Sequence, residues 1–276
     1  ATVTRISDEE FWIVSSGISE RYQKRFYNCV PLPENTSFQS RTDEMCGFNI
    51  AGPKSREILQ RLSNQDLSNK NWSFMRSGNL SIAGVSCLAL RISFTGDLGW
   101  EIYCEASKQQ IVYEALVQEA VNERGGPVGS RALMSLRIEK GYGSWSREYS
   151  PEVWPHECGL DNLCKLDKEF LNKGELEKKL KTKPRESLML IHLNEEDCRS
   201  SNADATGGEP VFKNGKGLGR ITSGAYGYTV GMSLALGYLK DVTPGDNVEV
   251  MVLGQPHRGK VLKAPPFDPD GKVLRS

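Results

Sequence analysis

The sequence has no excess of either charge, few histidines and no long apolar run. It carries 35 Lys and Arg against 35 Asp and Glu, with 3 His among 276 residues. Nucleic acids and anionic membranes attract proteins through net positive charge, and this balanced sequence indicates neither partner. No segment approaches the roughly 18 apolar residues of a membrane-spanning helix. We therefore expect no nucleic-acid partner and no membrane insertion, and we expect any charged ligand to be held by local contacts.

Paired cysteines are also missing. The seven cysteines are odd in number and form no CxxC pair: Cys29, Cys46, Cys87, Cys104, Cys158, Cys164 and Cys198. Such scatter favours free thiols in a reducing compartment over a disulfide framework. His156, Glu157 and Cys158 are adjacent in the chain, and adjacent residues rarely bind the same ion. No second pair of ligands follows at the spacing of a zinc site. We predict no metal site.

The usual enzyme motifs are absent as well. Gly215, Gly217 and Gly219 alternate within a predicted hairpin. They lack the third glycine of the GxGxxG dinucleotide-binding motif, and no helix follows them. Neither a P-loop, a GxSxG elbow nor an HExxH motif occurs. His192 and His257 fall in a predicted strand and a turn, where structural roles are usual. Because no catalytic dyad is visible, the residues favour a binding scaffold over a hydrolase.

Hydrophobic periodicity predicts an α+β arrangement for the first part of the chain. The predicted strands are residues 1–6, 10–14, 45–51 and 100–104, with two alternating runs between 80 and 94. In those runs Leu88, Leu90, Ile92 and Phe94 share one face. The predicted helices begin at Ser19 and after Pro53, and occupy residues 108–124 and 130–140. We expect the last two helices to pack on the antiparallel sheet.

The final part of the chain has a different pattern, with short strands and frequent turns. Strands are predicted at residues 188–193, 210–212, 218–223, 234–238, 248–252 and 259–262. Asn214-Gly215 is the strongest hairpin signal, and closely spaced strands of this kind indicate a small β-barrel. The charged stretch 173–183 is interpreted as a solvated linker or helix. We place the domain boundary there, giving residues 1–182 and 183–276.

One acidic residue lies in an apolar strand. Glu101 follows a glycine-containing turn within SFTGDLGWEIY, residues 93–103. A carboxylate in such a place must be paired or pay a desolvation cost of several kcal/mol. It could accept two parallel hydrogen bonds from an amidine-like edge such as that of a pterin, or form an arginine ion pair at the sheet edge. Arg131 and Arg137 lie on opposite flanks of their predicted helix, so at most one need face Glu101.

Four segments in order carry a family resemblance: residues 93–103, 129–142 (GSRALMSLRIEKGY), 219–238 (GRITSGAYGYTVGMSLALGY) and 264–272 (APPFDPDGK). Together they resemble the folate-dependent aminomethyltransferase family typified by the glycine cleavage T-protein. Within it, the chain is most similar to the C-terminal region of dimethylglycine and sarcosine dehydrogenases. The resemblance spans essentially the whole sequence. It implies a multi-lobed α+β fold around a tetrahydrofolate channel, followed by a C-terminal β-barrel.

The resemblance also assigns residues to the site. It implies that Glu101 grips the pterin, that Phe94 flanks it, and that Arg131 serves the folate-binding helix. It further implies that the pterin pocket is lined by Trp12, Val14 and Ser16. The family's catalytic aspartate would fall immediately before Ala1, so the catalytic residue is unknown. We expect this sequence to be part of a longer one.

The implied function is capture of a one-carbon unit as 5,10-methylene-tetrahydrofolate. In the dehydrogenases that the chain resembles, an upstream FAD domain, outside this sequence, would supply that unit by oxidising dimethylglycine or sarcosine. The resemblance implies a mitochondrial matrix location, with a bacterial cytoplasm as the alternative. Two other functions stay open: a non-catalytic homologue such as the pyruvate dehydrogenase phosphatase regulatory subunit, with a protein partner, and a stand-alone aminomethyltransferase.

Overall fold

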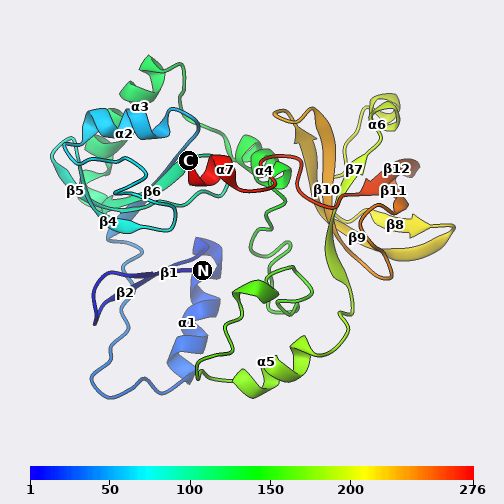
Figure 1. Cartoon of the computed structure of the whole chain (residues 1–276), viewed down its shortest axis with the longest axis horizontal. Coiled ribbons are helices and arrows are strands. Elements are labelled where there is room, and N and C mark those ends of the chain that lie inside the picture. Colours follow the sequence, from blue (N-terminus) through cyan, green and yellow to red (C-terminus); the bar gives the residue numbers. More distant parts are fainter. The chain divides into compact units, whose positions relative to one another are not determined.

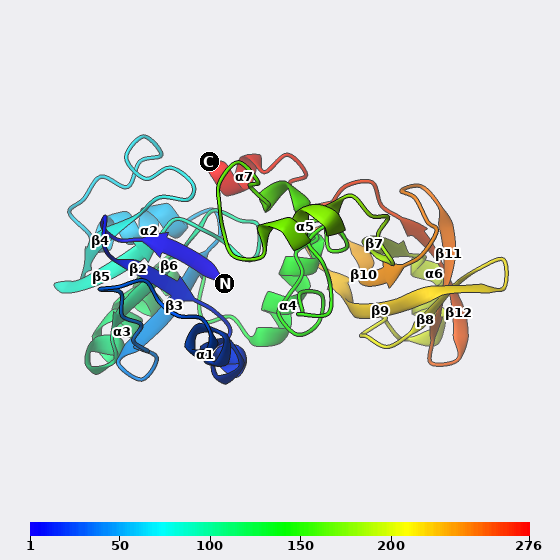
Figure 2. The same ribbon diagram turned by 90° about the horizontal axis from the view of Figure 1, so that it is seen from below.

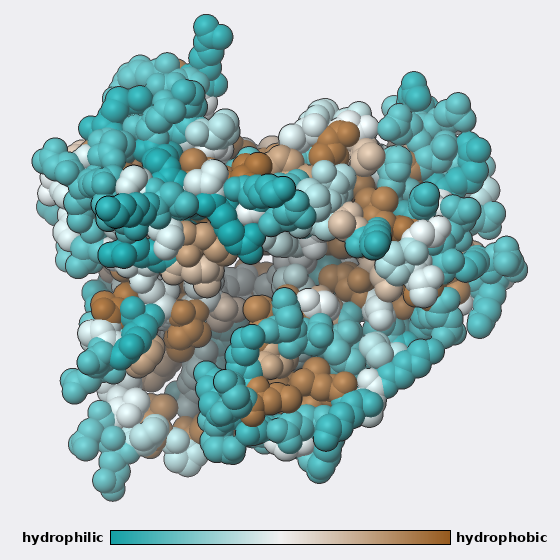
Figure 3. Space-filling model, in the orientation of Figure 1, coloured by the Kyte–Doolittle hydropathy of each residue, from teal (hydrophilic) through white to brown (hydrophobic).

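The computed structural model describes residues 1–276 and divides into two compact units. One comprises residues 1–127 together with 271–276, and the other comprises residues 128–270. The boundary predicted near residue 182 falls inside the second compact unit and stays a prediction. None of the helices combines the length and the apolar character that a membrane crossing requires. The surface in Figure 3 is mostly hydrophilic, with small groups of apolar side chains between the polar ones.

The first unit is built on a four-stranded antiparallel sheet in the order β3-β6-β5-β4. Its strands are β3 (Met45–Ala51), β4 (Ser77–Ile82), β5 (Val85–Leu90) and β6 (Gly99–Glu105). Helices α2 (Ser55–Leu62) and α3 (Gln109–Asn122) pack on one face (Figure 1). The core between them includes Leu59, Leu80, Ile82, Trp100, Ile102, Val112 and Leu116.

A two-stranded ribbon and a helix precede this sheet. The ribbon pairs β1 (Thr2–Arg5) with β2 (Phe11–Val14), and the 3-10 turn η1 (Gly17–Ser19) leads into α1 (Glu20–Cys29). Figures 1 and 2 show the ribbon beside the sheet, on the side away from α2 and α3. Trp12 on β2 contacts the ring of Tyr103 on β6, which fixes the ribbon against that face.

The C-terminal residues also belong to the first unit. Helix α7 (Lys272–Arg275) is held by Arg91, whose side chain is fully buried. Arg91 donates hydrogen bonds to the carbonyl oxygens of Leu274 at 3.1 Å and Ser276 at 2.8 Å. Its guanidinium lies over the Trp100 ring, 4.6 Å from the centroid. Burial, reinforced by the charge of Arg56, lowers the pKa of Arg91 to about 10, so the group stays charged at neutral pH.

The second unit contains a closed six-stranded barrel in the order β10-β7-β12-β11-β8-β9. The strands are β7 (Ser187–Leu193), β8 (Pro210–Lys213), β9 (Lys216–Gly227), β10 (Met232–Leu239), β11 (Asn247–Val252) and β12 (Gln255–Val261). The barrel and the Asn214-Gly215 hairpin between β8 and β9 confirm the predictions for this part. The helical elements of the second unit are α4 (Ser130–Glu139), η3 (Asp161–Leu163), α5 (Lys173–Leu180) and α6 (Glu195–Ser201). In the first unit, the 3-10 turn η2 (Ala106–Lys108) precedes α3.

Two expectations about packing are wrong. Strand β5 ends at Leu90, so Ile92 and Phe94 lie in the following loop rather than on the strand's face. Arg91 lies just beyond the strand, and its buried side chain binds a C-terminal carbonyl. Helix α4 packs on barrel strands β9 and β10, not on the four-stranded sheet. Strand β10 is buried along almost its whole length, and its second apolar face needs a cover that α4 supplies.

A buried ion pair joins α4 to the loop that follows it. Arg137 and Glu148 are both fully buried, with 2.9 Å between Nη1 and Oε2. Burial pushes the pKa of Glu148 upward, but hydrogen bonds from Ser223 and Thr222 and the charge of Arg137 outweigh it. The net pKa is therefore below its usual range, and Glu148 is ionised. Arg137 is thus occupied structurally and is not a candidate partner for Glu101.

We expect Glu148→Gln to lower the free energy of unfolding by about 3–5 kcal/mol, because it leaves the buried guanidinium without a counter-charge. Urea unfolding followed by circular dichroism measures this change. The same substitution at exposed Glu152 should cost less than about 0.5 kcal/mol. Equal effects of the two substitutions would show that the buried pair has no special weight.

A second ion pair gives the stability a pH dependence. The Glu157 side chain is 3% exposed and binds Arg185 through two hydrogen bonds of 2.7 and 2.8 Å. These bonds lower the pKa of Glu157 from 4.5 to about 2. The folded carboxylate therefore resists protonation at pH values where the unfolded one accepts a proton. Its stabilisation is complete above about pH 4.5 and disappears as the pH falls through 2.

We expect Glu157→Gln to destabilise the chain by about 1–2 kcal/mol at pH 7, a value reduced because Arg185 is exposed to solvent. At pH 3 the difference between the variant and the parent chain should be clearly smaller. Urea midpoints at the two pH values measure it. A difference that does not change with pH would contradict this origin of the stability.

Candidate functional site

A cavity of about 330 Å³ lies within the first unit. Its walls come from strand β2, the start of α1, the loop 37–42 and the exposed face of the sheet. The lining includes Trp12, Val14, Ser16, Gln23, Tyr27, Phe38, Arg41, Gly47 and Tyr103. Ligand pockets generally have volumes of about 300–1,000 Å³, so this cavity can accept a small planar molecule.

Aromatic rings form two of the cavity walls. Trp12 and Tyr103 meet edge to face, with 5.7 Å between ring centroids and an interplanar angle of 74°. Tyr27 and Phe38 also line the cavity, and their ring centroids are 4.8 Å apart. Rings in these arrangements offer flat apolar surfaces to a heterocycle. The cavity is therefore suited to a ring system with polar edges.

Glu101 stands next to this cavity through Tyr103. Both residues are on β6 two positions apart, so both point to the face opposite the hydrophobic core. The Tyr103 hydroxyl donates a hydrogen bond of 2.5 Å to Glu101 Oε2. The side chain of Glu101 is half-buried, and no arginine or lysine forms an ion pair with it. The alternative prediction, an arginine ion pair at the sheet edge, is therefore wrong for Glu101.

A charged group occupies the α1 side of the cavity. Glu20 Oε1 accepts hydrogen bonds from Ser40 at 2.6 Å and from Lys24 at 2.7 Å. The bonds from Lys24, Ser40 and Thr42 lower the pKa of Glu20 to about 2, so this carboxylate is ionised and occupied. It ties α1 to the loop 37–42. Glu20 therefore shapes the cavity, while Glu101 has an oxygen that accepts no hydrogen bond from the chain.

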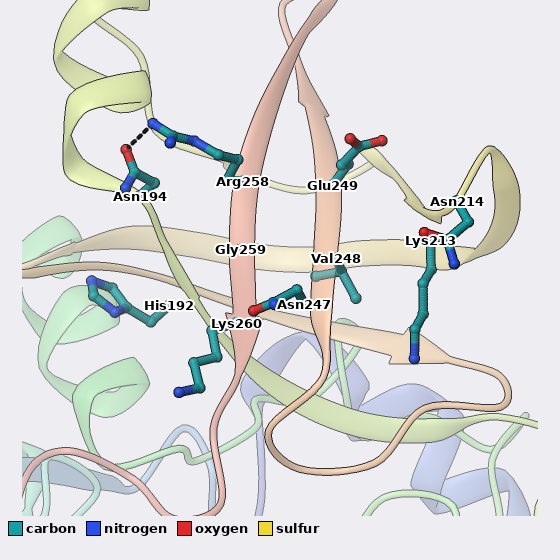
Figure 4. A pocket seen from close by; sticks show the side chains of 10 residues that line it. All are labelled: His192, Asn194, Lys213, Asn214, Asn247, Val248, Glu249, Arg258, Gly259 and Lys260. Atoms are coloured by element: carbon teal, nitrogen blue, oxygen red, sulfur yellow. Dashed lines mark hydrogen bonds between the residues drawn. The ribbon is translucent and has the colours of Figure 1, made fainter.

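The barrel has a second cavity of about 440 Å³ on its outer surface. Figure 4 shows His192 and Lys260 at one side and Lys213 at the other, with Asn247 between them. Lys213 is already paired with Asp246, and Arg258 with Asp197 and Asn194. No Phe, Tyr or Trp side chain lines this cavity. It lacks the large apolar rings of the first cavity, and we do not place the candidate site there.

The predicted site residues divide into three groups. Trp12, Val14 and Ser16 line the first cavity, and Glu101 is joined to it by Tyr103. Phe94 is half-buried in the loop after β5 and does not line the cavity. Arg131 is exposed on α4, in the second compact unit. The roles assigned to these residues stay predictions.

Sequence reasoning overlooked Tyr103, Tyr27 and Phe38. Tyr103 was detectable, because a residue two positions from Glu101 on a strand must share its face. Tyr27 and Phe38 are brought together by the fold of a proline-containing loop, for which the sequence has no periodic signal. The aromatic walls of the cavity thus depend on tertiary contacts.

The first unit thus combines an aromatic cavity with a neighbouring carboxylate that has no ionic partner, and a closed barrel follows in the chain. Comparison with known families gives the class of protein. The model of the GCVT N-terminal domain matches residues 1–168, and that of the glycine cleavage T-protein C-terminal barrel domain matches residues 190–268. The chain belongs to the glycine cleavage T-protein family.

Both dehydrogenases and aminomethyltransferases are among the relatives. The chain is 32% identical over 273 residues to the mitochondrial dimethylglycine dehydrogenase of Homo sapiens, covering 96% of this chain and 31% of the relative. It is 32% identical over 264 residues to the aminomethyltransferase of Thermotoga neapolitana, covering 95% of this chain and 70% of the relative. The chain therefore spans about a third of the length of the dehydrogenase.

A solved structure shows the same fold. The glycine cleavage system aminomethyltransferase T of Bartonella henselae superposes with a TM-score of 0.71 at 20% identity. The superposition covers 82% of this chain and 60% of that one. The multi-lobed α+β fold with a C-terminal barrel is thereby confirmed.

Proposed function

We propose that this chain is the tetrahydrofolate-binding region of an FAD-dependent N-methylglycine dehydrogenase of dimethylglycine or sarcosine type. Its role is to capture the one-carbon unit as 5,10-methylene-tetrahydrofolate. The observation that carries the proposal is Glu101, a half-buried carboxylate without an ionic partner beside an aromatic cavity. The similarity to dimethylglycine dehydrogenase, over 96% of this chain, supports it.

The residues of the cavity fit tetrahydrofolate. A pterin presents a ring N–H next to an exocyclic amine, and a carboxylate can accept both hydrogen bonds in parallel. Glu101 has free acceptor positions for both, because its Oε1 accepts no hydrogen bond from the chain and Oε2 accepts only one. Trp12 and Tyr103 would form the wall for the ring. Arg131 and Phe94 are proposed as further folate contacts by family resemblance.

Tetrahydrofolate supplies the nucleophilic nitrogen that accepts the one-carbon unit. The residues of this chain contribute binding and orientation. Glu101 fixes the rotation of the ring in its plane, and the aromatic wall excludes water from one side of it. Holding two reactants in the correct geometry can replace a large part of a bimolecular barrier. The chain would thus act by proximity, intercepting a unit that would otherwise be lost as formaldehyde.

The proposed partner is a flavin domain on the same polypeptide. We infer it because the dehydrogenase relative extends well beyond the part that this chain matches. Such a domain would bind FAD and oxidise the N-methyl amine. A mitochondrial matrix location is proposed on the same ground, since the relative's name specifies mitochondria, and a bacterial cytoplasm is the alternative.

A stand-alone aminomethyltransferase is the second candidate function. It is favoured by the Thermotoga neapolitana relative, of which the chain covers 70%. The two functions share the folate site and differ in the donor of the one-carbon unit. The full-length sequence distinguishes the two functions. An FAD-binding region in the same polypeptide would support the dehydrogenase, and its absence would support the transferase. The regulatory homologue without catalysis would show neither formaldehyde capture nor aminomethyl transfer.

Removal of the carboxylate tests the site. We expect Glu101→Ala to weaken tetrahydrofolate binding about 10- to 100-fold, because hydrogen bonds to a charged group contribute about 1.5–3 kcal/mol. Anaerobic isothermal titration calorimetry of the whole chain measures the dissociation constant. Glu105→Ala, on the exposed end of the same strand, is the matched control and should bind as the parent chain does.

Two results would count against this proposal in different ways. A parent chain that binds no tetrahydrofolate would refute the proposed function. Binding that is equally weakened by Glu101→Ala and Glu105→Ala, or by neither, would refute the placement of the pterin at Glu101.

A further inference from the structure

We propose that Tyr103 is a positioning residue whose phenol holds the Glu101 carboxylate in the orientation that selects a ligand by its amidine-like edge. The inference rests on the proposed function and names how the same site chooses its ligand. Lining the cavity explains the ring of Tyr103 but not the hydrogen bond from its hydroxyl to Glu101.

The contact between the two residues is short and exclusive. Tyr103 Oη donates to Glu101 Oε2 at 2.5 Å, and this is the one hydrogen bond that the chain gives that carboxylate. A glutamate has several rotatable bonds, and a half-exposed one without a partner samples many rotamers. The phenol removes most of this freedom. It leaves Oε1 and one lone pair of Oε2 available for two parallel N–H donors.

The phenol is itself fixed by its neighbours. Tyr103 pairs with Gly47 across strands β6 and β3. A Cβ at position 47 would lie 2.8 Å from Tyr103 Cε1, so only glycine lets the ring lie across β3. Gly47 is needed for space and not for backbone conformation, because its φ is outside the left-handed region. The Trp12 ring also packs against the Tyr103 ring, at an interplanar angle of 74°.

Tyr103 remains a donor throughout the physiological pH range. Burial raises its pKa, and the negative charge of Glu101 and the hydrogen bond to it raise that pKa further, above the usual range of tyrosine. The phenol therefore stays protonated. The phenol can therefore donate to Glu101 throughout that range.

A fixed carboxylate discriminates between ligands. A pterin with its 2-amino group satisfies both free acceptor positions, whereas an analogue without that amine leaves one acceptor unpaired. An unpaired buried acceptor costs more than the missing bond itself. A mobile carboxylate would turn toward water and discriminate less. The ratio of the two affinities therefore reports the orientation of Glu101.

The test uses Tyr103→Phe in the whole chain, which keeps the ring and removes the hydroxyl. Anaerobic calorimetry gives the dissociation constants of tetrahydrofolate and of 2-desamino-tetrahydrofolate. The parent chain should prefer tetrahydrofolate by about 10-fold or more, and the variant should lose about 5-fold of that preference. An unchanged ratio, whether both affinities stay the same or fall equally, overturns the proposal.

A second variant guards against a folding defect in the first. Gly47→Ala keeps the phenol but displaces its ring, and we expect it to lower the same ratio. Gly126→Ala, where an added Cβ meets nothing within 4 Å, is the control and should leave the ratio intact. If Gly47→Ala also preserves the ratio, the proposal is wrong. If the parent chain binds no tetrahydrofolate, the proposed function fails and this inference with it, whereas an unchanged ratio in a binding chain refutes the inference alone.

Discussion

The alternation of side chains along strand β6 is the constraint on which the site depends. Trp100, Ile102 and Cys104 point into the core under α2 and α3, and are almost fully buried. Because successive side chains on a strand face opposite ways, Glu101 and Tyr103 share the other face of the sheet, where Tyr103 contacts the ribbon and lines the cavity. A shift of one residue in register would place the carboxylate in the core. The same core packing that stabilises the sheet therefore sets the direction of the candidate binding group.

The second unit shows the opposite use of acidic residues. Glu148 and Glu157 are each nearly fully buried, but both are held by an arginine and by further hydrogen bonds. Their pKa values are lowered, and their ionised side chains stabilise the fold. Glu101 differs because its one partner is a neutral phenol. That contrast separates Glu101 from Glu148 and Glu157.

The sequence predicted those features that depend on local patterns. The turn at Asn214-Gly215 and the short strands around it predict the barrel, and the apolar run around Glu101 predicts strand β6. It could not predict which surface α4 covers, because that depends on strand β10 being apolar on both faces. The return of residues 271–276 to Arg91 was also undetectable, since the two segments are far apart in the chain. Of the site, Trp12, Val14 and Ser16 were placed by resemblance, while the Tyr27–Phe38 wall required the fold.

A crystal structure of this chain with tetrahydrofolate, grown without oxygen, tests the central claim most directly. We expect the pterin ring in the cavity of the first unit, against Trp12 and Tyr103, with its ring N–H and exocyclic amine bonded to the Glu101 carboxylate. A pterin bound elsewhere, such as the outer surface of the barrel, or bound in the cavity with its amine turned away from Glu101, would contradict it.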